Sequence, residues 1–215
     1  MNPYDIIFHF YPQDTPLRRL LLLHSEKVRD KALSILAEAR LKDPERFASV
    51  DESLVNAGAL LHDIGIGRTH APSILCEGTE NYICHGTIGA EMLRALSLET
   101  ESASVFTPSQ AALDTKHMAW DKQFIESLAR ICERHTGSGL TREDIVSQGL
   151  PIEPARDLLP ETLEEQLVCL ADKFYSKSGD LAREKDFERV KRSMMKFGAA
   201  SMARFEALCD TFYLK

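Results

Sequence analysis

The sequence predicts an all-α helical bundle with an extra C-terminal helix. Helical spacing of apolar residues recurs along nearly the whole chain, and no run of alternating residues indicates a strand. Helix-capping signals open several of these periodic segments. The chain has 215 residues, 44% of them hydrophobic, which is enough to bury a core without disulfides. We expect one domain over residues 1–215, with a core at about 17–178 and a helical appendage at about 184–215.

The first expected helix opens at Thr15-Pro16, a capping residue followed by proline at the first helical position. Its apolar stripe also carries His24. A second helix begins near Asp51 and continues into His62-Asp63, where Gly65 stops it. The first two helices therefore each bring a histidine to an apolar face or to a helix end.

The middle of the chain is less regular. Residues 68–84 are expected to form a loop, and a third helix starts near His85. Residues 99–120 are polar and fit either a short helix or a surface excursion. A fourth helix is expected over about 122–133, and it ends at His135, before a glycine.

The last third combines a connector with two helices. Thr141 caps a short helix, and the three prolines within 149–160 mark a connector. Thr162-Leu163-Glu164-Glu165 predicts a capping box that opens a helix containing Asp172. A single final helix is expected from about Glu184 to Phe212. Its basic residues are interleaved with acids, and its apolar stripe of Phe187, Val190, Met194 and Phe197 predicts that it packs against the bundle or a second subunit.

Charge and cysteine content exclude several classes of protein. The formal net charge of −7 argues against general nucleic-acid binding, but it allows a small phosphorylated substrate. The five cysteines are odd in number and lack the C-x-x-C spacing, which indicates reduced cysteines in a cytoplasmic protein. We see no signal peptide, and the longest aliphatic run, Leu20–Leu23, is far too short to span a membrane.

An apolar run that ends in an adjacent imidazole and carboxylate is the most informative feature. It reads Leu60-Leu61-His62-Asp63-Ile64-Gly65. Burying these two polar groups without partners is costly, and a divalent metal ion would satisfy both. Other imidazoles and carboxylates that lie on apolar helix faces or helix ends are candidate co-ligands: His24, His85, His135 and Asp172.

Each co-ligand alone has an ordinary interpretation. His24 can be a hydrogen-bonded core histidine, and His85 a residue near a helix cap. His135 can be a histidine favoured by a helix C-terminus, and Asp172 half of a surface ion pair with Lys173. Their joint occurrence around His62-Asp63 favours a metal site.

The order of these residues resembles the HD-domain metal-dependent phosphohydrolase superfamily, over roughly residues 17–178. His62-Asp63-Ile64-Gly65 matches the common form of its central motif, and Ala171-Asp172-Lys173 resembles its final aspartate motif. In dinuclear members two further histidines lie between them. Here those places hold His85, within His85-Gly86-Thr87-Ile88-Gly89-Ala90-Glu91, and His135, within Cys132-Glu133-Arg134-His135-Thr136-Gly137.

The resemblance implies a ligand set for two divalent transition-metal ions. One ion would be held by His24, His62, Asp63 and Asp172. Asp63 would bridge to a second ion, held also by His85 and His135. Iron and manganese are expected, or another such as nickel, cobalt or zinc.

The implied reaction is hydrolysis of a phosphoester of a nucleotide or related small phosphorylated metabolite by a metal-activated hydroxide. Asp63 would also orient the water. We expect Arg68 and Lys173 to act in catalysis as phosphate contacts, and Lys177 to bind substrate with them. Lys177 lies four residues after Lys173, one helical turn along a shared face.

The sequence does not identify the substrate. The loop from His70 to Tyr82 and the segment from Glu99 to Trp120 look longer than in related chains, and both can border the pocket. The Gly-Tyr-Pro signature of cyclic-dinucleotide phosphodiesterases is absent. A monophosphatase, a dinucleoside polyphosphate hydrolase and a cyclic-nucleotide phosphodiesterase remain candidates.

Two other functions share the same ligand set: a di-iron oxygenase, and a non-catalytic module that binds a nucleotide. The expected partner is a small phosphorylated substrate rather than nucleic acid or a membrane, and a homodimer remains open.

Overall fold

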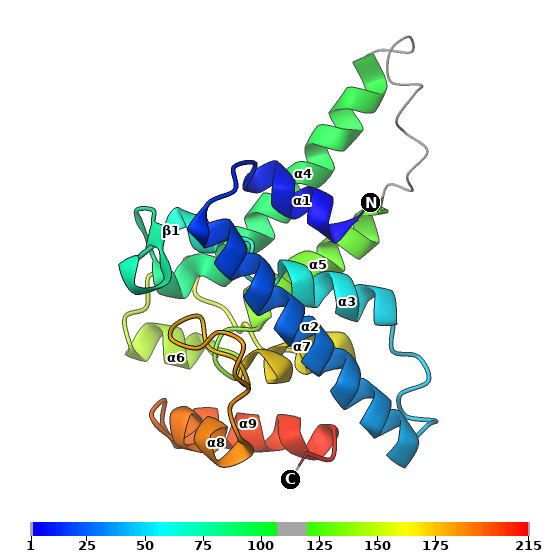
Figure 1. Cartoon of the computed structure of the whole chain (residues 1–215), viewed down its shortest axis with the longest axis vertical. Helices are drawn as coiled ribbons and strands as arrows, with labels where there is room; N and C mark the ends of the chain where they lie inside the picture. The colour runs from blue at the N-terminus through cyan, green and yellow to red at the C-terminus, as the bar shows by residue number, and fades with distance from the viewer. Residues whose placement is uncertain (1, 107–119, 215) are drawn as a thin grey trace.

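The all-α prediction is confirmed. The structure, a computed structural model, describes residues 2–106 and 120–214 as a helical bundle with one small sheet at its edge (Figure 1). The α-helices in chain order are α1 (Pro3–Phe10), α2 (Pro16–Lys42), α3 (Glu52–Leu61), α4 (His85–Phe106), α5 (Lys122–Arg134), α6 (Arg142–Ser147), α7 (Leu163–Asp172), α8 (Phe187–Met195) and α9 (Ala199–Thr211).

The long helix α2 organises the bundle. It crosses the face of Figure 1 and packs against α3 and α7, while α4 packs along α5. One apolar cluster joins α2, α3 and α7 to α8 and α9, and it buries Phe47, Phe205 and Phe212. A second cluster joins α1 and the first half of α2 to α3, α4 and α5. Both clusters include residues of α3, the helix that leads into His62-Asp63.

Helix α1 was not expected from the sequence. Asn2 caps it by accepting a hydrogen bond from the Tyr4 backbone N–H, and Pro3 opens it. It buries Ile6 and Ile7 in the second cluster. Its eight residues are too few for a strong periodic signal in the sequence.

Residues 68–84 form more than a loop, which corrects the prediction. They hold strands β1 (Thr69–Ala71), β2 (Cys76–Glu77) and β3 (Glu80–Asn81), and the 3₁₀ turns η1 (Ile66–Arg68), η2 (Pro72–Ile74) and η3 (Tyr82–Cys84). The sheet order is β2-β1-β3, with β1 antiparallel to β2 and parallel to β3. Strands of two or three residues are too short to show alternation.

The single final helix expected over 184–212 is instead two helices. Helix α8 ends at Met195, and α9 starts after Gly198, whose φ is +93°. Glycine adopts this left-handed region without the steric cost that a side chain adds, so the chain turns there. The turn is closed by hydrogen bonds from Phe197 N–H to Met194 O and from Gly198 N–H to Met195 O.

Two further expectations fall near elements that the structure describes. Thr162 caps α7 as predicted, but the Glu165 carboxylate accepts the Glu161 N–H, so the reciprocal half of the capping box is not made. Within the expected 99–120 segment, α4 continues to Phe106. The rest of that segment, up to residue 119, lies outside the described residues.

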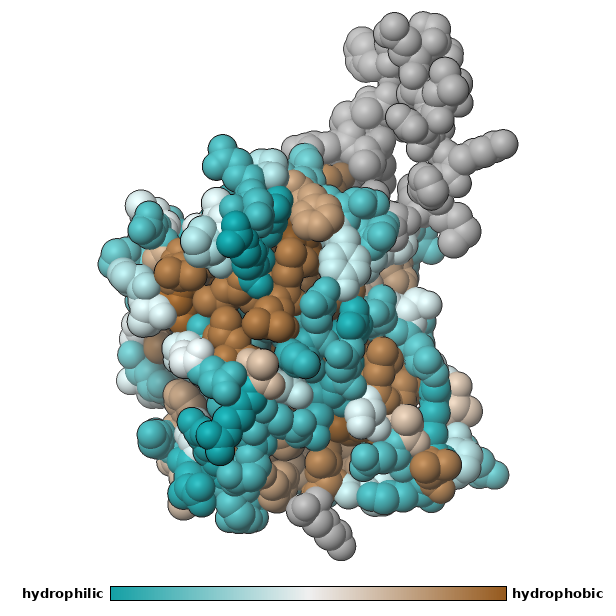
Figure 2. Space-filling model, in the orientation of Figure 1, coloured by the Kyte–Doolittle hydropathy of each residue, from teal (hydrophilic) through white to brown (hydrophobic). Residues whose placement is uncertain are grey.

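Hydrophilic side chains cover most of the face shown in Figure 2, and apolar ones gather over the first half of α2. Among the residues placed in the structure, no helix combines the length and apolar character that a membrane crossing needs.

Candidate metal centre

The end of α3 places the central His-Asp pair. His62 caps α3 in helical conformation, and a hydrogen-bonded turn carries the chain through Asp63 to Gly65. Gly65 lies against the start of α4: a Cβ there would stand 2.3 Å from the His85 carbonyl oxygen and 2.5 Å from the Gly89 nitrogen. Only glycine permits this approach, which brings Asp63 beside the first residue of α4.

The structure brings all six sequence-predicted ligands together from α2, the end of α3, α4, α5 and α7. They fall into two groups in which one donor atom per residue lies within 4.8 Å of the others. The groups are His24, His62, Asp63 and Asp172, and Asp63, His85 and His135. All six are buried. Asp63 is the member that the two groups share.

The two oxygens of the Asp63 carboxylate face different imidazoles. Oδ2 lies 3.3 Å from His62 Nε2 and 3.4 Å from His24 Nε2. Oδ1 lies 3.4 Å from the Nε2 atoms of both His85 and His135. A carboxylate placed in this way could contribute one oxygen to each group of imidazoles.

Hydrogen bonds orient three of the imidazoles. Nδ1 of His62 lies 2.7 Å from the Ala59 carbonyl oxygen. In the same way, Nδ1 of His85 lies 2.6 Å from the Tyr82 carbonyl oxygen, and Nδ1 of His135 lies 2.7 Å from the Cys132 carbonyl oxygen. A carbonyl oxygen only accepts, so Nδ1 carries the proton in each ring. When these rings are neutral, their Nε2 lone pairs point into the centre, as metal-ligating histidines require.

Several imidazole nitrogens and carboxylate oxygens in the centre lack the hydrogen bonds that would satisfy them, and a bound cation would do so. Nε2 of His85 lies 3.0 Å from Nε2 of His135, although neutral rings protonated at Nδ1 offer two acceptors there. Within residues 2–106 and 120–214, His62 Nε2 and Asp63 Oδ1 make no hydrogen bond. Imidazole nitrogens and carboxylate oxygens in this number suit a divalent transition metal.

The electrostatics keep most of the ligands ready to bind a cation. Burial lowers the pKa of His24 to about 4 and that of His85 to about 3, so both are neutral at pH 7. Burial opposes charging of His62 as well, but the Asp63 and Asp172 carboxylates outweigh it and raise its pKa to about 9. The pKa of Asp63 lies well below its usual range because His62 and Lys177 outweigh its burial.

Two lysines add positive charge. Lys177 Nζ lies 2.8 Å from Asp63 Oδ2 and 3.6 Å from Asp172 Oδ1, and these carboxylates hold its pKa well above the usual value despite burial. Lys173 Nζ lies 2.7 Å from Asp172 Oδ2 and donates to the His135 carbonyl oxygen at 3.1 Å. The expected helical spacing between the lysines is wrong, because α7 ends at Asp172 and Lys177 reaches the centre from the following segment.

Arg68 lies apart from this group. It ends η1 with an exposed side chain and is not among the residues that line the cavity beside the centre. A phosphate contact from Arg68 stays a prediction.

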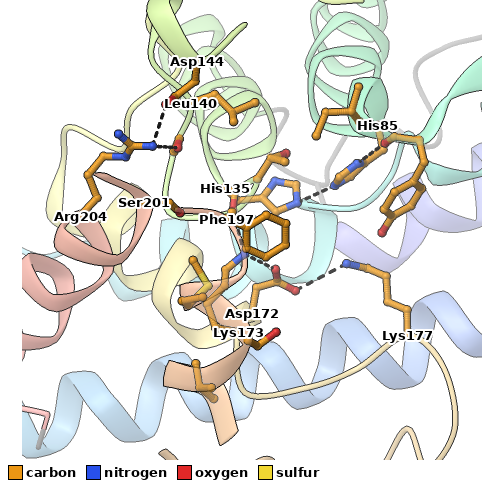
Figure 3. Close-up of a pocket in the computed structure, with 18 of the residues that line it drawn as sticks. His85, His135, Leu140, Asp144, Asp172, Lys173, Lys177, Phe197, Ser201 and Arg204 are labelled. Atoms are coloured by element: carbon orange, nitrogen blue, oxygen red, sulfur yellow. Dashed lines mark hydrogen bonds and ion pairs between the residues drawn. The ribbon is translucent and has the colours of Figure 1, made fainter. Parts of the chain in front are cut away.

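A cavity of about 710 Å³ opens onto the centre (Figure 3). His85, His135 and Asp172 line it together with Lys173 and Lys177. Its other walls come from η3, from the segment around α6, and from α8 and α9. A molecule in the cavity can therefore reach three of the candidate metal ligands.

Two tyrosines that sequence analysis missed support the centre. The Tyr82 ring stacks on His85, with ring centroids 4.7 Å apart and planes 17° apart. Tyr11, just after α1, donates its hydroxyl to the Ile64 carbonyl oxygen at 2.7 Å and accepts the Gly67 N–H at 3.0 Å. Because Tyr82 is close to His85 in the sequence, its contact with His85 could have been expected. Nothing in the sequence indicates the contacts of Tyr11.

Comparisons with known proteins agree with this architecture. The family model described as HD domain matches residues 21–176. An uncharacterized protein of Methanocaldococcus jannaschii (MJ0778) is 36% identical over 153 residues, covering 70% of this chain and 67% of that protein. No solved structure matches the chain.

Two curated relatives carry the name tRNA (cytidine(56)-2'-O)-methyltransferase. The protein from Picrophilus torridus is 32% identical over 160 residues, which is 73% of this chain and 35% of the relative. The protein from Thermoplasma volcanium is 25% identical over 207 residues, which is 96% of this chain and 45% of the relative. The chain thus spans less than half the length of these two relatives.

Proposed function

Because the chain belongs to the HD-domain family, we propose that it is a metal-dependent phosphohydrolase that cleaves a phosphoester of a nucleotide or related small phosphorylated metabolite. The observation that carries the proposal is the pair of buried ligand groups that share Asp63, three of whose members, His85, His135 and Asp172, line a cavity. Two lysines that line the same cavity supply the positive charge that a phosphate needs.

We assign one ion to His24, His62, Asp63 and Asp172, and a second to Asp63, His85 and His135. Iron or manganese, or another such as nickel, cobalt or zinc, suits these nitrogen and oxygen donors. When bound, such ions lower the pKa of water toward neutrality and neutralise charge on phosphoryl oxygens.

The remaining groups position the substrate. The Lys177 ammonium lies at the Asp63 carboxylate, so a phosphoryl group near Asp63 would also meet a fixed positive charge. Lys173 is held by Asp172 and the His135 carbonyl oxygen at the same cavity wall. A fixed charge in a mostly buried site stabilises an anion more than one in bulk water.

The methyltransferase names belong to proteins of which this chain matches less than half, so we transfer no methylation activity to it. The net charge of −7 also favours a small substrate over a nucleic acid.

A metal-supplemented screen tests the proposal. The purified protein is assayed with manganese or iron against nucleoside monophosphates, dinucleoside polyphosphates, cyclic nucleotides and sugar phosphates. We expect hydrolysis of at least one class, and at least a hundredfold loss in Asp63→Ala. The exposed Asp210, changed to alanine on α9, serves as the control and should keep full activity.

Metal-loaded protein that hydrolyses none of these phosphoesters would contradict the proposal. Turnover that requires dioxygen would instead favour a di-iron oxygenase.

A further inference from the structure

The cavity beside the metal centre has a second, apolar region. Its walls include apolar side chains from η3, from both sides of α6, and from α8 and the turn that follows: Ile83, Leu140, Leu150, Val190, Met194 and Phe197. Helices α8 and α9 lie outside residues 21–176, which the family model matches. Three of these six residues, Val190, Met194 and Phe197, therefore come from the part of the chain that the family match does not reach.

Phe197 is the one aromatic side chain that the α8–α9 turn adds to this cavity wall, among the residues that the structure places there. It is 65% exposed, unlike the core phenylalanines, and it lines the cavity next to Gly198. Figure 3 shows its ring pointing into the cavity that Asp172 and His135 also line. Met195, the last residue of α8, is 60% exposed and does not line the cavity. The ring of Phe197 is thus available to a molecule bound in the cavity.

Hydrogen bonds fix this wall relative to the metal centre. Ser138, three residues after the ligand His135, donates its hydroxyl to the Ser201 carbonyl oxygen at 2.8 Å. Arg204 donates to the Gly139 carbonyl oxygen at 3.2 Å and to Asp144 Oδ2 at 2.7 Å. Phe205 is fully buried in the main core and anchors α9. These contacts therefore hold the α8–α9 turn, and with it Phe197, in a fixed position relative to the candidate metal ligands.

The polar and the apolar region of the cavity suit chemically different parts of one bound molecule. Lys173, Lys177 and the metal ligands suit an anionic phosphate. The apolar wall with an open aromatic face suits a flat ring, because stacking on an aromatic side chain tolerates any base. A cavity of about 710 Å³ lies in the range that encloses a molecule of nucleotide size.

We propose that the α8–α9 turn forms a nucleobase subsite, that Phe197 stacks on the base, and that the substrate is a nucleoside phosphate rather than a sugar phosphate. This inference rests on the proposed phosphohydrolase function, and it identifies the substrate class of that site. It makes Phe197 a specificity-determining residue.

The test compares substrates that share ribose and phosphate and differ in the base. Wild type, Phe197→Ala, Phe197→Trp and Met195→Ala are assayed with the four common nucleoside 5'-monophosphates and with ribose 5-phosphate. We expect Phe197→Ala to lower the ratio of kcat/KM for the best nucleotide to that for ribose 5-phosphate by about tenfold, the size of one lost stacking contact. The change should lie mainly in KM. Phe197→Trp should restore the ratio, and Met195→Ala should leave it unchanged.

A ratio that does not change in Phe197→Ala, or that Met195→Ala lowers equally, would overturn the subsite. Wild type that prefers ribose 5-phosphate would overturn it as well, while leaving the phosphohydrolase intact.

Nucleotide binding, measured by calorimetry with the same monophosphates, separates the two proposals. Binding that Phe197→Ala weakens about tenfold, in a protein that hydrolyses nothing, would support the subsite and reject the phosphohydrolase. Absence of nucleotide binding by wild type would reject the subsite.

Discussion

Asp63 links the two halves of the centre because its two carboxylate oxygens face different histidines. His24 and His62 lie near Oδ2, and His85 and His135 near Oδ1. Hydrogen bonds from Nδ1 to backbone carbonyl oxygens fix His62, His85 and His135. His24 is held differently, through Nε2 at 3.0 Å from Asp172 Oδ1.

The histidines make the stability of the metal-free protein depend on pH. The pKa of His24 is lowered by burial to about 4, against 6.5 in an unfolded chain. The unfolded state therefore binds more protons below pH 6.5, so the stabilisation from this neutral ring is complete above that pH. It is lost as the pH falls toward 4. Each such histidine adds at most about 1.4 kcal/mol per pH unit to the slope of the unfolding free energy.

We therefore expect chelator-treated protein to lose stability steadily between pH 6 and 5, as measured by urea unfolding. His24→Gln should have a shallower slope than wild type over this interval. Equal slopes in the two proteins would show that His24 does not titrate as the structure indicates.

At the scale of elements, α1 and the segment after α3 act together. The Tyr11 hydroxyl joins Ile64 to Gly67 and so shapes the turn that follows Asp63. Tyr11 is largely buried, and burial raises its pKa to about 12. Removing the hydroxyl leaves a carbonyl and an N–H without their partner.

Tyr11→Phe should cost about 1–3 kcal/mol in unfolding free energy, the range for buried polar groups left unpaired. Metal affinity should also fall, because the turn carrying Asp63 loses its support. Tyr4→Phe is the matched control: its hydroxyl bonds Glu26 and Arg29 and is less buried than that of Tyr11, so the loss should stay below about 1 kcal/mol. An unchanged metal affinity in Tyr11→Phe would contradict the positioning role.

The elements best predicted from the sequence are those with long apolar periodicity. The starts of α2, α3 and α7 follow their capping residues, Thr15, Asp51 and Thr162, as expected. The missed elements are short: α1, the three strands, and the break at Gly198. Periodicity needs several turns of helix to be visible, and one positive φ at a glycine leaves the pattern intact on both sides.

The candidate ligands were visible because each lies on an apolar helix face or at a helix end. The cavity was not, because its walls join segments more than 60 residues apart, such as Ser138 with Ser201. The place of Lys177 beside Asp63 depends on where α7 ends, and sequence spacing put that boundary too late.

At the scale of the whole molecule, metal binding and folding should be coupled. The ligands lie on or just after five helices, of which α7 packs in the first apolar cluster and α4 in the second, so a bound ion would hold distant parts of the chain together. A ligand that binds only the folded state adds about 2.7 kcal/mol at a concentration a hundredfold above its Kd.

Chelation should therefore lower the melting temperature of the wild-type protein, and added manganese should restore it. Asp63→Ala should melt at nearly the same temperature with and without the metal. A wild-type melting temperature that does not respond to metal would argue against a resident ion in the folded protein.

The number of metal ions per chain tests the central proposal, a two-ion centre bridged by Asp63. Purified and reconstituted protein is analysed for metals by plasma mass spectrometry, beside His85→Ala/His135→Ala and Asp63→Ala. The geometry predicts about two ions in wild type, about one in the double variant, and almost none in Asp63→Ala. One ion in both wild type and the double variant, or two ions retained in Asp63→Ala, would contradict it.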